Sequence, residues 1–317
     1  MVQCNSSSDE GLKKLTAADF EGAFNDTLSQ YIRTKIKEYD FCYFDLTLTE
    51  RDSWIRKIVD VLLAPNIEEA GEHRFEQWEK GWGQNLDELE TSSTVEALVP
   101  RYYGKYNVLR WKQKFITPAH KDFERNSHAI IQDWLFDKYM RNAETVYEFG
   151  CGPGHNLFRV RNVNPKAKIW GLDWATSSQK IIQRLARNGI DRNFFAKRFN
   201  FFDPDENFNL ENNSIIYTSA SIEQVGTQYK RFVEYLLRQR PALCIHIEPI
   251  AEFLDENNLL DYLSIQYFKK RKYLSGYLDF LRQLEKRGQI KIHRAQRTYI
   301  GSLFIEGYSV IVWSPVK

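Results

Sequence analysis

The sequence predicts an α/β protein built on a seven-stranded, mostly parallel, doubly wound sheet that follows a helical N-terminal region. From Thr145 onward, short apolar runs alternate with helical stretches, the order that produces parallel strands with helices on both faces. Before that point, apolar residues recur at steps of three and four, as in amphipathic helices. We therefore expect a helical region over residues 1–142 and a sheet-containing domain over residues 143–317.

Helices account for most of the expected N-terminal region. They are expected at about residues 16–36, 49–64, 68–90 and 122–140. Capping patterns at Thr16 and Thr49 open the first two, and Pro65 ends the second. The stretch over residues 100–118, rich in Tyr, Arg and Lys, is expected to be irregular.

The sheet-containing domain begins with five short apolar runs that read as strands. These runs, and two more near the end of the chain, cover about residues 146–149, 168–172, 199–202, 214–217, 243–248, 290–297 and 308–313. Helices are expected from about His155, over residues 177–187, and over residues 257–286 as an insert after the fifth strand. Glu306 and Gly307 favour a hairpin-like return between the last two strands.

The composition favours a folded protein and argues against several kinds of partner. The chain has 43% hydrophobic residues, and its 44 basic and 42 acidic residues nearly balance, so binding to nucleic acid is not expected. We find no apolar signal segment and no window of about 18 apolar residues, so no membrane association is expected. The four cysteines lie far apart and the histidines do not cluster, so no metal is expected. We expect a cytoplasmic monomer or homodimer.

A glycine-rich loop between the first strand and the next helix is the most informative motif. It runs Glu148-Phe-Gly150-Cys-Gly152-Pro-Gly154, and glycines let a backbone approach a ligand closely because no Cβ intrudes. A dinucleotide loop would place its third glycine at position 155, which is His155 here. The pattern resembles motif I of the class I (Rossmann-like) methyltransferases that use S-adenosylmethionine (SAM). The resemblance implies SAM as the cofactor, with the glutamate and the three glycines in its site.

Later positions extend this resemblance through about residue 317. Asp173 ends the second strand, 23 positions after Gly150, where a carboxylate can accept hydrogen bonds from both ribose hydroxyls. In the family the next residue, here Trp174, commonly packs on the adenine. Phe202 and Asp203 follow, where the family often has an acid near the adenine amino group; Asp203 with the next proline is equally an ordinary turn.

The segment after the fourth strand supplies Ser219 to the expected cofactor site and ends in Glu223 and Gln224. Many small-molecule methyltransferases have a similar segment that ends in Glu-His. Here Gln224 stands in place of that histidine, so proton transfer by a histidine at this position is in question. We expect Gln224 to contact the substrate instead.

Three residues are candidate catalytic bases: Glu223, Glu248 and His246. They lie at the carboxyl ends of the fourth and fifth strands, where open α/β sheets bind ligands. His246 and Glu248 share one face of a strand, and Glu248, just before Pro249, is the stronger candidate. The alternatives are a capping or ion-pairing role for Glu248 and a hydrogen-bonded core position for His246.

Aromatic residues in two helical stretches are candidate substrate contacts. Trp78 and Trp82 share a window with two glycines, which cost about 1 kcal/mol each inside a helix, so a kinked segment at the site is one interpretation. Tyr267 and Tyr273 lie in the insert after the fifth strand, which family members often use as a lid. Their faces could surround a cation. For both pairs the alternative is an ordinary helical core.

These features together predict a SAM-dependent methyltransferase that acts on a polar small molecule by in-line transfer, with the N-terminal region as a lid. Proximity and alignment would supply most of the catalysis, with a base for a nucleophile that carries a proton. One alternative is a cyclase or lyase in which SAM itself is the substrate and methylthioadenosine is released. Another is a SAM-binding protein without catalysis, and a nicotinamide-dependent dehydrogenase is disfavoured by the glycine spacing.

Overall fold

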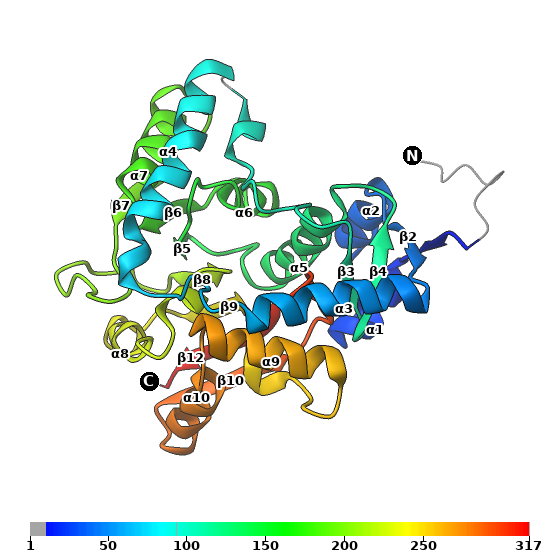
Figure 1. Ribbon diagram of the computed structural model, residues 1–317. Coiled ribbons are helices and arrows are strands. Elements are labelled where there is room, and N and C mark those ends of the chain that lie inside the picture. Colours follow the sequence, from blue (N-terminus) through cyan, green and yellow to red (C-terminus); the bar gives the residue numbers. More distant parts are fainter. Residues whose placement is uncertain (1–10, 93, 317) are drawn as a thin grey trace.

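The computed structural model describes residues 11–92 and 94–316, and its main feature is a seven-stranded sheet (Figure 1). The strands are β5 Thr145–Phe149, β6 Lys168–Asp173, β7 Phe194–Arg198, β8 Ile215–Ser219, β9 Leu243–Glu248, β10 Ile290–Gln296 and β12 Ser309–Pro315. Their order is β10-β12-β9-β8-β5-β6-β7. The strands from β9 to β7 are parallel, whereas β12 is antiparallel to both of its neighbours. The fold class predicted from the sequence is confirmed.

Helices cover both faces of this sheet. One face carries α5 Phe123–Tyr139, α6 Leu157–Val163 and α7 Thr176–Arg187, and the other carries α8 Lys230–Gln239 and α10 Tyr277–Lys286. Strand β5 shows the alternation, because Val146 packs with the first group and Tyr147 with the second. Helix α5 belongs to the predicted N-terminal region, yet it lies fully on the sheet, with Ile130 and Ile131 buried.

A second, antiparallel sheet lies at the other end of the molecule. Its order is β1-β2-β4-β3-β11, with β1 Lys13–Lys14, β2 Cys42–Asp45, β3 Leu109–Trp111, β4 Lys114–Pro118 and β11 Ile300–Gly301. The prediction of an irregular stretch over residues 100–118 is wrong where β3 and β4 form. Lys112 and Gln113 make the tight turn between β3 and β4 with φ of 46° and 60°. Asn and Gly favour this conformation, so Lys and Gln at these positions did not indicate a turn.

Strand β11 comes from the connection between β10 and β12. The predicted hairpin-like return between those two strands is therefore interrupted, although they do pair antiparallel. The third strand of the large sheet is also displaced from its prediction. It occupies residues 194–198, and the aromatic run at residues 199–202 forms the following loop. Both segments of this region are rich in phenylalanine, so their composition alone did not distinguish strand from loop.

The N-terminal helices differ from the prediction mainly at their ends. They are α1 Ala17–Phe24, α2 Gln30–Glu38, α3 Leu48–Leu63 and α4 Phe75–Ser92. The single helix expected up to Ile36 is broken by Asn25, whose φ of 46° ends α1. Helix α3 is capped by Thr47 rather than Thr49. Helix α4 runs without interruption through its two glycines and lies beside α7 (Figure 1).

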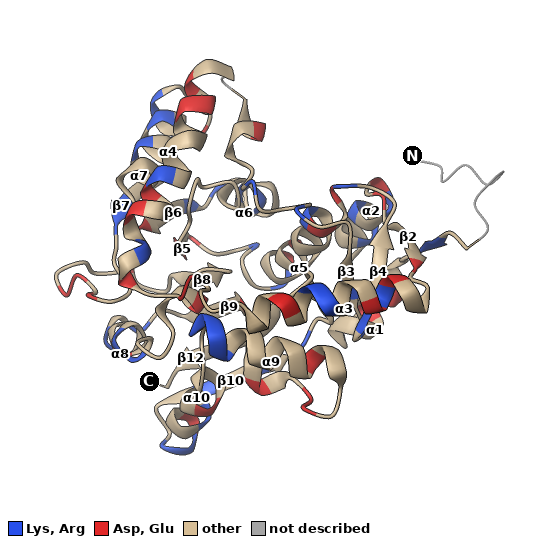
Figure 2. Ribbon diagram, in the orientation of Figure 1, with Lys and Arg blue, Asp and Glu red and all other residues tan. Residues whose placement is uncertain are grey.

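Helix α9 Leu259–Arg271 completes the fold and packs near α3 and the second sheet. None of the helices in the described ranges is both long and apolar enough to cross a bilayer. Lysine and arginine are interspersed with aspartate and glutamate along α3 and α4 in Figure 2, whereas the charged residues of α7 are all basic.

Candidate active site

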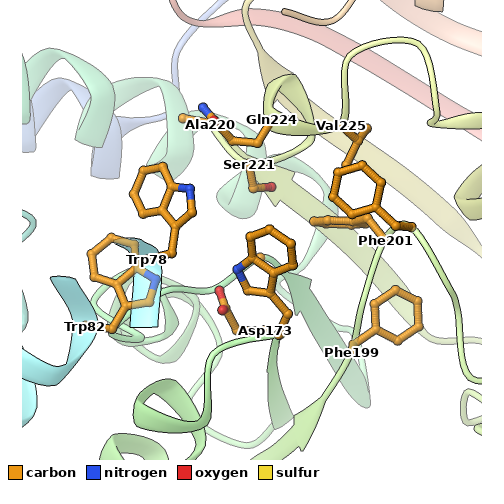
Figure 3. A pocket seen from close by; sticks show the side chains of 12 residues that line it. Trp78, Trp82, Asp173, Phe199, Phe201, Ala220, Ser221, Gln224 and Val225 are labelled. Carbon is orange, nitrogen blue, oxygen red and sulfur yellow. The ribbon is translucent and has the colours of Figure 1, made fainter. Parts of the chain in front are cut away.

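A cavity lies where β8, β5 and β6 end, at one edge of the large sheet (Figure 3). Its volume is about 510 Å³ when the space open to solvent is included. We call it the glycine-loop pocket, and it is lined by Trp78, Trp82, Gly150, Asp173, Trp174, Phe199, Phe201, Phe202, Ala220, Ser221, Gln224 and Val225. Open parallel sheets bind ligands at this edge, outside the carboxyl ends of their strands.

The glycine loop needs glycine at two positions for steric reasons. Gly150 and Gly152 have φ of 74° and 52°, a region that residues with a Cβ rarely occupy. A Cβ on Gly150 would collide with Ser221, and one on Gly152 would lie 2.9 Å from a ring carbon of Trp82. Of the predicted cofactor glycines only Gly150 lines the pocket, because Trp82 covers Gly152 and Gly154 packs against Ile182.

Glu148 lies beneath the loop and does not line the pocket. It is fully buried and accepts hydrogen bonds from Asn156 Nδ2 at 2.7 Å and from Tyr217 Oη at 2.8 Å. Burial raises the pKa of Glu148 to about 8, against the effect of these two donors. Glu148, which the resemblance placed in the cofactor site, therefore links β5 to α6 and β8 through hydrogen bonds. It acts as a positioning residue for the glycine loop.

Asp173 presents its carboxylate to the pocket. Its oxygens accept the backbone N–H groups of Gly152 at 2.8 Å and Ala175 at 2.9 Å. Burial raises the pKa of Asp173 to about 6, and these hydrogen bonds act in the opposite direction. A carboxylate has about four acceptor positions, so Asp173 can accept further donors such as those of a diol. The adjoining wall is flat, because Trp174 and Phe202 stack with ring centroids 5.8 Å apart.

Two of the predicted cofactor residues point elsewhere. The side chain of Asp203 is 88% exposed, lies 3.9 Å from Arg231 and is absent from the glycine-loop pocket, so the ordinary-turn interpretation describes its position. Ser219 is buried and its Oγ accepts a hydrogen bond from Gln132 on α5 at 3.0 Å. The next residues, Ala220 and Ser221, line the pocket instead, because Ala220 has a φ of 50° and turns the chain.

Helix α4 brings the two predicted tryptophans over the pocket. Trp78 and Trp82 stack with centroids 5.4 Å apart and face Phe199 and Phe201 across the cavity (Figure 3). Glu79, between them in the chain, accepts the backbone N–H groups of Thr176 and Ser177 at 2.6 and 3.0 Å. Because these groups belong to the start of α7, Glu79 fixes α4 to the large sheet and so places the tryptophans.

A second, larger cavity adjoins the first and shares Trp78, Ala220 and Gln224 with it; its volume is about 1390 Å³ when the space open to solvent is included. We call it the tyrosine-lined pocket. It is lined by Glu68, Arg74, Gln77, Trp78, Tyr102, Lys105, Tyr106, Val108, Glu124, Ala220, Glu223, Gln224, Pro249, Tyr267, Arg271, Tyr273, Ser302, Phe304, Ile305, Gly307 and Tyr308. The two tyrosines predicted to contact substrate, Tyr267 and Tyr273, are both in its wall.

Two carboxyl groups lie one behind the other at the junction of the cavities. Glu223 lines the tyrosine-lined pocket, and its Oε2 has no hydrogen-bond partner among the described residues. Glu248 is fully buried behind it and accepts the N–H of Ser221 at 3.0 Å. Burial and the neighbouring Glu223 raise the pKa of Glu248 well above its ordinary range. Of the three predicted bases, Glu223 is the one that lines a cavity, whereas Glu248 lies behind it.

Gln224 orients Glu223. Its Nε2 donates to Glu223 Oε1 at 2.9 Å, while its Oε1 accepts a hydrogen bond from Arg74. Arg74 is itself buried, 5.0 Å from the ring of Trp78, and pairs with Glu68 at 3.2 Å. An amide can donate and accept at once, which this bridge between a carboxylate and a guanidinium requires. Sequence reasoning missed Arg74, since nothing local marks a partner 150 positions away.

His246 lies in the core and lines neither cavity. Its Nε2 accepts the indole N–H of Trp313 at 2.9 Å, and its Nδ1 lies 2.9 Å from the hydroxyl of Thr218. Burial lowers the pKa of His246 to about 3, so the ring is neutral. The hydrogen-bonded core position, rather than the catalytic one, describes this histidine.

Comparison with known proteins shows similarity of fold only. No family model matches the chain, and no curated protein matches its sequence. Human N-acetylserotonin methyltransferase in complex with SAM is 11% identical over 85% of this chain and 66% of that one, with a TM-score of 0.45. The O-methyltransferase NcsB1 from neocarzinostatin biosynthesis, solved with SAM and 2-hydroxy-5-methyl naphthoic acid, is 13% identical over 61% of this chain and 58% of that one, with a TM-score of 0.42. The small RNA methyltransferase HEN1 is 15% identical over 64% of this chain and 28% of that one, with a TM-score of 0.46.

Proposed function

We propose that the chain is a SAM-dependent methyltransferase that acts on a polar small molecule. The observation that carries this proposal is the meeting of two cavities at Trp78, Ala220 and Gln224. One cavity lies beside the glycine loop and Asp173, and the other contains a buried carboxylate, Glu223. Methyl transfer needs a donor site and an acceptor site that touch, because the reacting atoms must be aligned and close.

The glycine-loop pocket has the features that SAM requires. Asp173 has acceptor positions left for the two ribose hydroxyls, and the stacked Trp174 and Phe202 offer a flat surface for the adenine. Gly150 leaves the backbone open to the ligand. When bound, SAM supplies a methyl group on a positively charged sulfur, which an acceptor attacks in line.

The tyrosine-lined pocket is the proposed acceptor site, with Glu223 as the general base. Its unpartnered Oε2 can take the proton that a hydroxyl or amine acceptor loses. Gln224 and Arg74 hold the carboxylate in place, and Glu248 acts through Glu223 as a positioning residue. Trp78 and Trp82, held by Glu79, cover the cofactor side and exclude water from the junction.

The test is to incubate the purified chain with SAM carrying a labelled methyl group and fractionated small-molecule extracts. The proposal expects a labelled product and S-adenosylhomocysteine that forms only when an acceptor fraction is present. Methylthioadenosine that forms from SAM alone would contradict the proposal and support the cyclase or lyase. Absence of SAM binding by calorimetry would overturn the cofactor assignment as well.

A further inference from the structure

Arg271 is a cation in the wall of the tyrosine-lined pocket that lacks a carboxylate partner. None of the ion pairs within residues 11–92 and 94–316 includes it, and the nearby carboxylates Glu68 and Glu69 pair with Arg74 and Lys272. Its Nε is buried without a hydrogen-bond acceptor in the same part of the chain. A partly buried guanidinium with an unfilled donor is costly unless a ligand completes it.

Two tyrosine rings hold this guanidinium in a fixed orientation. Its central carbon lies 5.0 Å from the ring centroid of Tyr273 and 6.0 Å from that of Tyr267. One terminal nitrogen, Nη2, donates to Tyr273 Oη at 3.0 Å. No acceptor within residues 11–92 and 94–316 bonds its other N–H groups, and a planar guanidinium with such donors matches the geometry of a carboxylate or a phosphate.

The other charges of the pocket do not neutralise Arg271. Glu124 is buried, and burial raises its pKa to about 7, so much of this group is protonated near neutral pH. Glu223 is engaged by Gln224 at the junction with the other cavity. Lys105 adds a second cation on the rim, 5.7 Å from the ring of Tyr106. Among the described residues, the pocket wall therefore contains two cations without a carboxylate partner, Arg271 and Lys105, beside the Arg74–Glu68 pair and the carboxyl group of Glu223.

We propose that the acceptor is an anion, a small molecule whose carboxylate or phosphate group binds Arg271. This rests on the proposed function where it assigns the reacting group to Glu223. An anionic group is attracted to Arg271 and repelled by the Glu223 carboxylate, so the two charges together orient the acceptor with its hydroxyl or amine at the base. Arg271 and Glu223 would together reject a neutral analogue of the acceptor, because such a molecule leaves the Arg271 guanidinium without a partner.

The test measures anion binding to the full chain by calorimetry at constant ionic strength. The probes are inorganic phosphate and the matched pair glucose and glucose 6-phosphate. The wild type is expected to bind phosphate and glucose 6-phosphate at least tenfold more tightly than glucose. Arg271→Gln should lose at least tenfold of that affinity, and Arg271→Lys should keep part of it. The control Arg282→Gln, an exposed arginine on α10, should behave as the wild type.

SAM affinity, measured on the same proteins, separates this proposal from the proposed function. We expect all variants to bind SAM like the wild type, which also shows that they are folded. A wild type that binds neither phosphate probe better than glucose would overturn the anionic acceptor, and so would an Arg271→Gln variant that binds the probes unchanged. Failure of every protein to bind SAM would instead overturn the proposed function and leave the anion result standing.

Discussion

Asp173 and Asp203, predicted from neighbouring strand ends, differ in what their carboxylates face. Asp173 is buried in the wall of the glycine-loop pocket, whereas the side chain of Asp203 is 88% exposed beside Arg231. A carboxylate that accepts two ligand hydroxyls contributes charged hydrogen bonds of roughly 1.5–3 kcal/mol each. The surroundings of each residue, and not its motif, therefore predict that Asp173 and not Asp203 contributes to SAM affinity.

We expect Asp173→Ala to weaken SAM binding by at least tenfold and Asp203→Ala to leave it unchanged, as measured by calorimetry. Asp173→Asn is the companion variant, because it keeps the volume beside Gly152 and Ala175 and so separates lost ligand contacts from a collapsed loop. Equal SAM affinities for the Asp173 and Asp203 variants would show that Asp173 does not bind the ribose.

Glu223 is expected to matter for turnover and not for cofactor affinity. Glu223→Gln keeps the shape of the side chain but removes its ability to take a proton, so methyl transfer to an extract-derived acceptor should fall by about 10²–10⁴-fold. SAM affinity should stay the same. Glu234→Gln, an exposed position on α8, is the matched control. Retained turnover in Glu223→Gln would exclude this residue as the base.

Glu148 makes the stability of the fold depend on pH. Its folded pKa is about 8 against an ordinary value of 4.5, so the native state binds more protons than the unfolded state between these values. The free energy of unfolding should therefore fall as pH rises across this window, by up to about 1.4 kcal/mol per pH unit from this group. The pKa values of Glu124 and Asp173 are raised as well, so these groups also make the free energy of unfolding fall as pH rises.

Urea unfolding at several pH values between 5.5 and 8 would measure this dependence. Glu148→Gln should flatten it, since the amide does not ionise and still accepts from Asn156 or Tyr217. Glu144→Gln, an exposed position just before β5, should keep the wild-type slope. A Glu148→Gln variant with an unchanged slope would show that Glu148 is ionised in the fold.

At the scale of elements, two carboxylates of α4 join it to α7: Glu79, which is hydrogen-bonded to the start of α7, and Glu90, which pairs with Arg184 at 3.1 Å. Glu79 accepts two backbone N–H groups at the start of α7, which otherwise have no partner in the helix. We expect Glu79→Ala to lower the free energy of unfolding by about 0.5–2 kcal/mol, the usual cost of a lost cap. It should also weaken SAM binding, because α4 carries Trp78 and Trp82.

Limited proteolysis of the same variant would report on α4 directly. Cleavage within residues 75–92 should be faster in Glu79→Ala than in the wild type. Glu76→Ala removes an equally charged but exposed side chain of the same helix and should show neither effect. If both variants behave alike, the contact between α4 and α7 does not depend on this cap.

Elements with long, regular apolar patterns were predictable, and those defined by distant partners were not. Helices α3, α5 and α7 and strands β5, β6 and β9 lie within a few residues of their expected positions. Strand β3 was missed because its three residues gain their structure by pairing with Lys114 and Ile300, and the latter is far away in the chain. Short strands carry too few residues for a periodic signal.

The same reasoning applies to the site across the whole molecule. The position of Gly150 and Asp173 at a cavity was predictable because the glycine-loop motif is local in sequence. Arg74 was not, since its hydrogen-bond partner Gln224 lies on a distant element. The tyrosine-lined pocket in particular is built from both ends of the chain, with Tyr106 and Phe304 packed at 5.6 Å. The expected division near residue 143 therefore stays a proposal about folding units, because the second sheet takes strands from both regions.

Arg110 and Arg297 are hydrogen-bonded to α9 and to residues 303–306, the connection that precedes β12. Arg110, on β3, donates to the carbonyls of Leu303 and Leu260 at 3.1 and 2.7 Å. Arg297 pairs with Asp261 of α9 at 2.7 Å and with Glu306 at 2.5 Å. These contacts hold residues 302–308, several of which line the tyrosine-lined pocket. The two regions should consequently unfold together.

Arg297→Met tests this coupling, because it leaves Asp261 and Glu306 buried without their cation. Breaking a buried ion pair from one side costs about 3–5 kcal/mol, and we expect a loss of that size in urea unfolding. Circular dichroism and tryptophan fluorescence should still report one common transition, since tryptophans lie in both regions. The exposed Arg282→Met is the control and should stay within about 0.5 kcal/mol of the wild type. Separate transitions for the two probes would mean that the second sheet and the large sheet are independent units. The shape of the tyrosine-lined pocket would then depend on how these units dock.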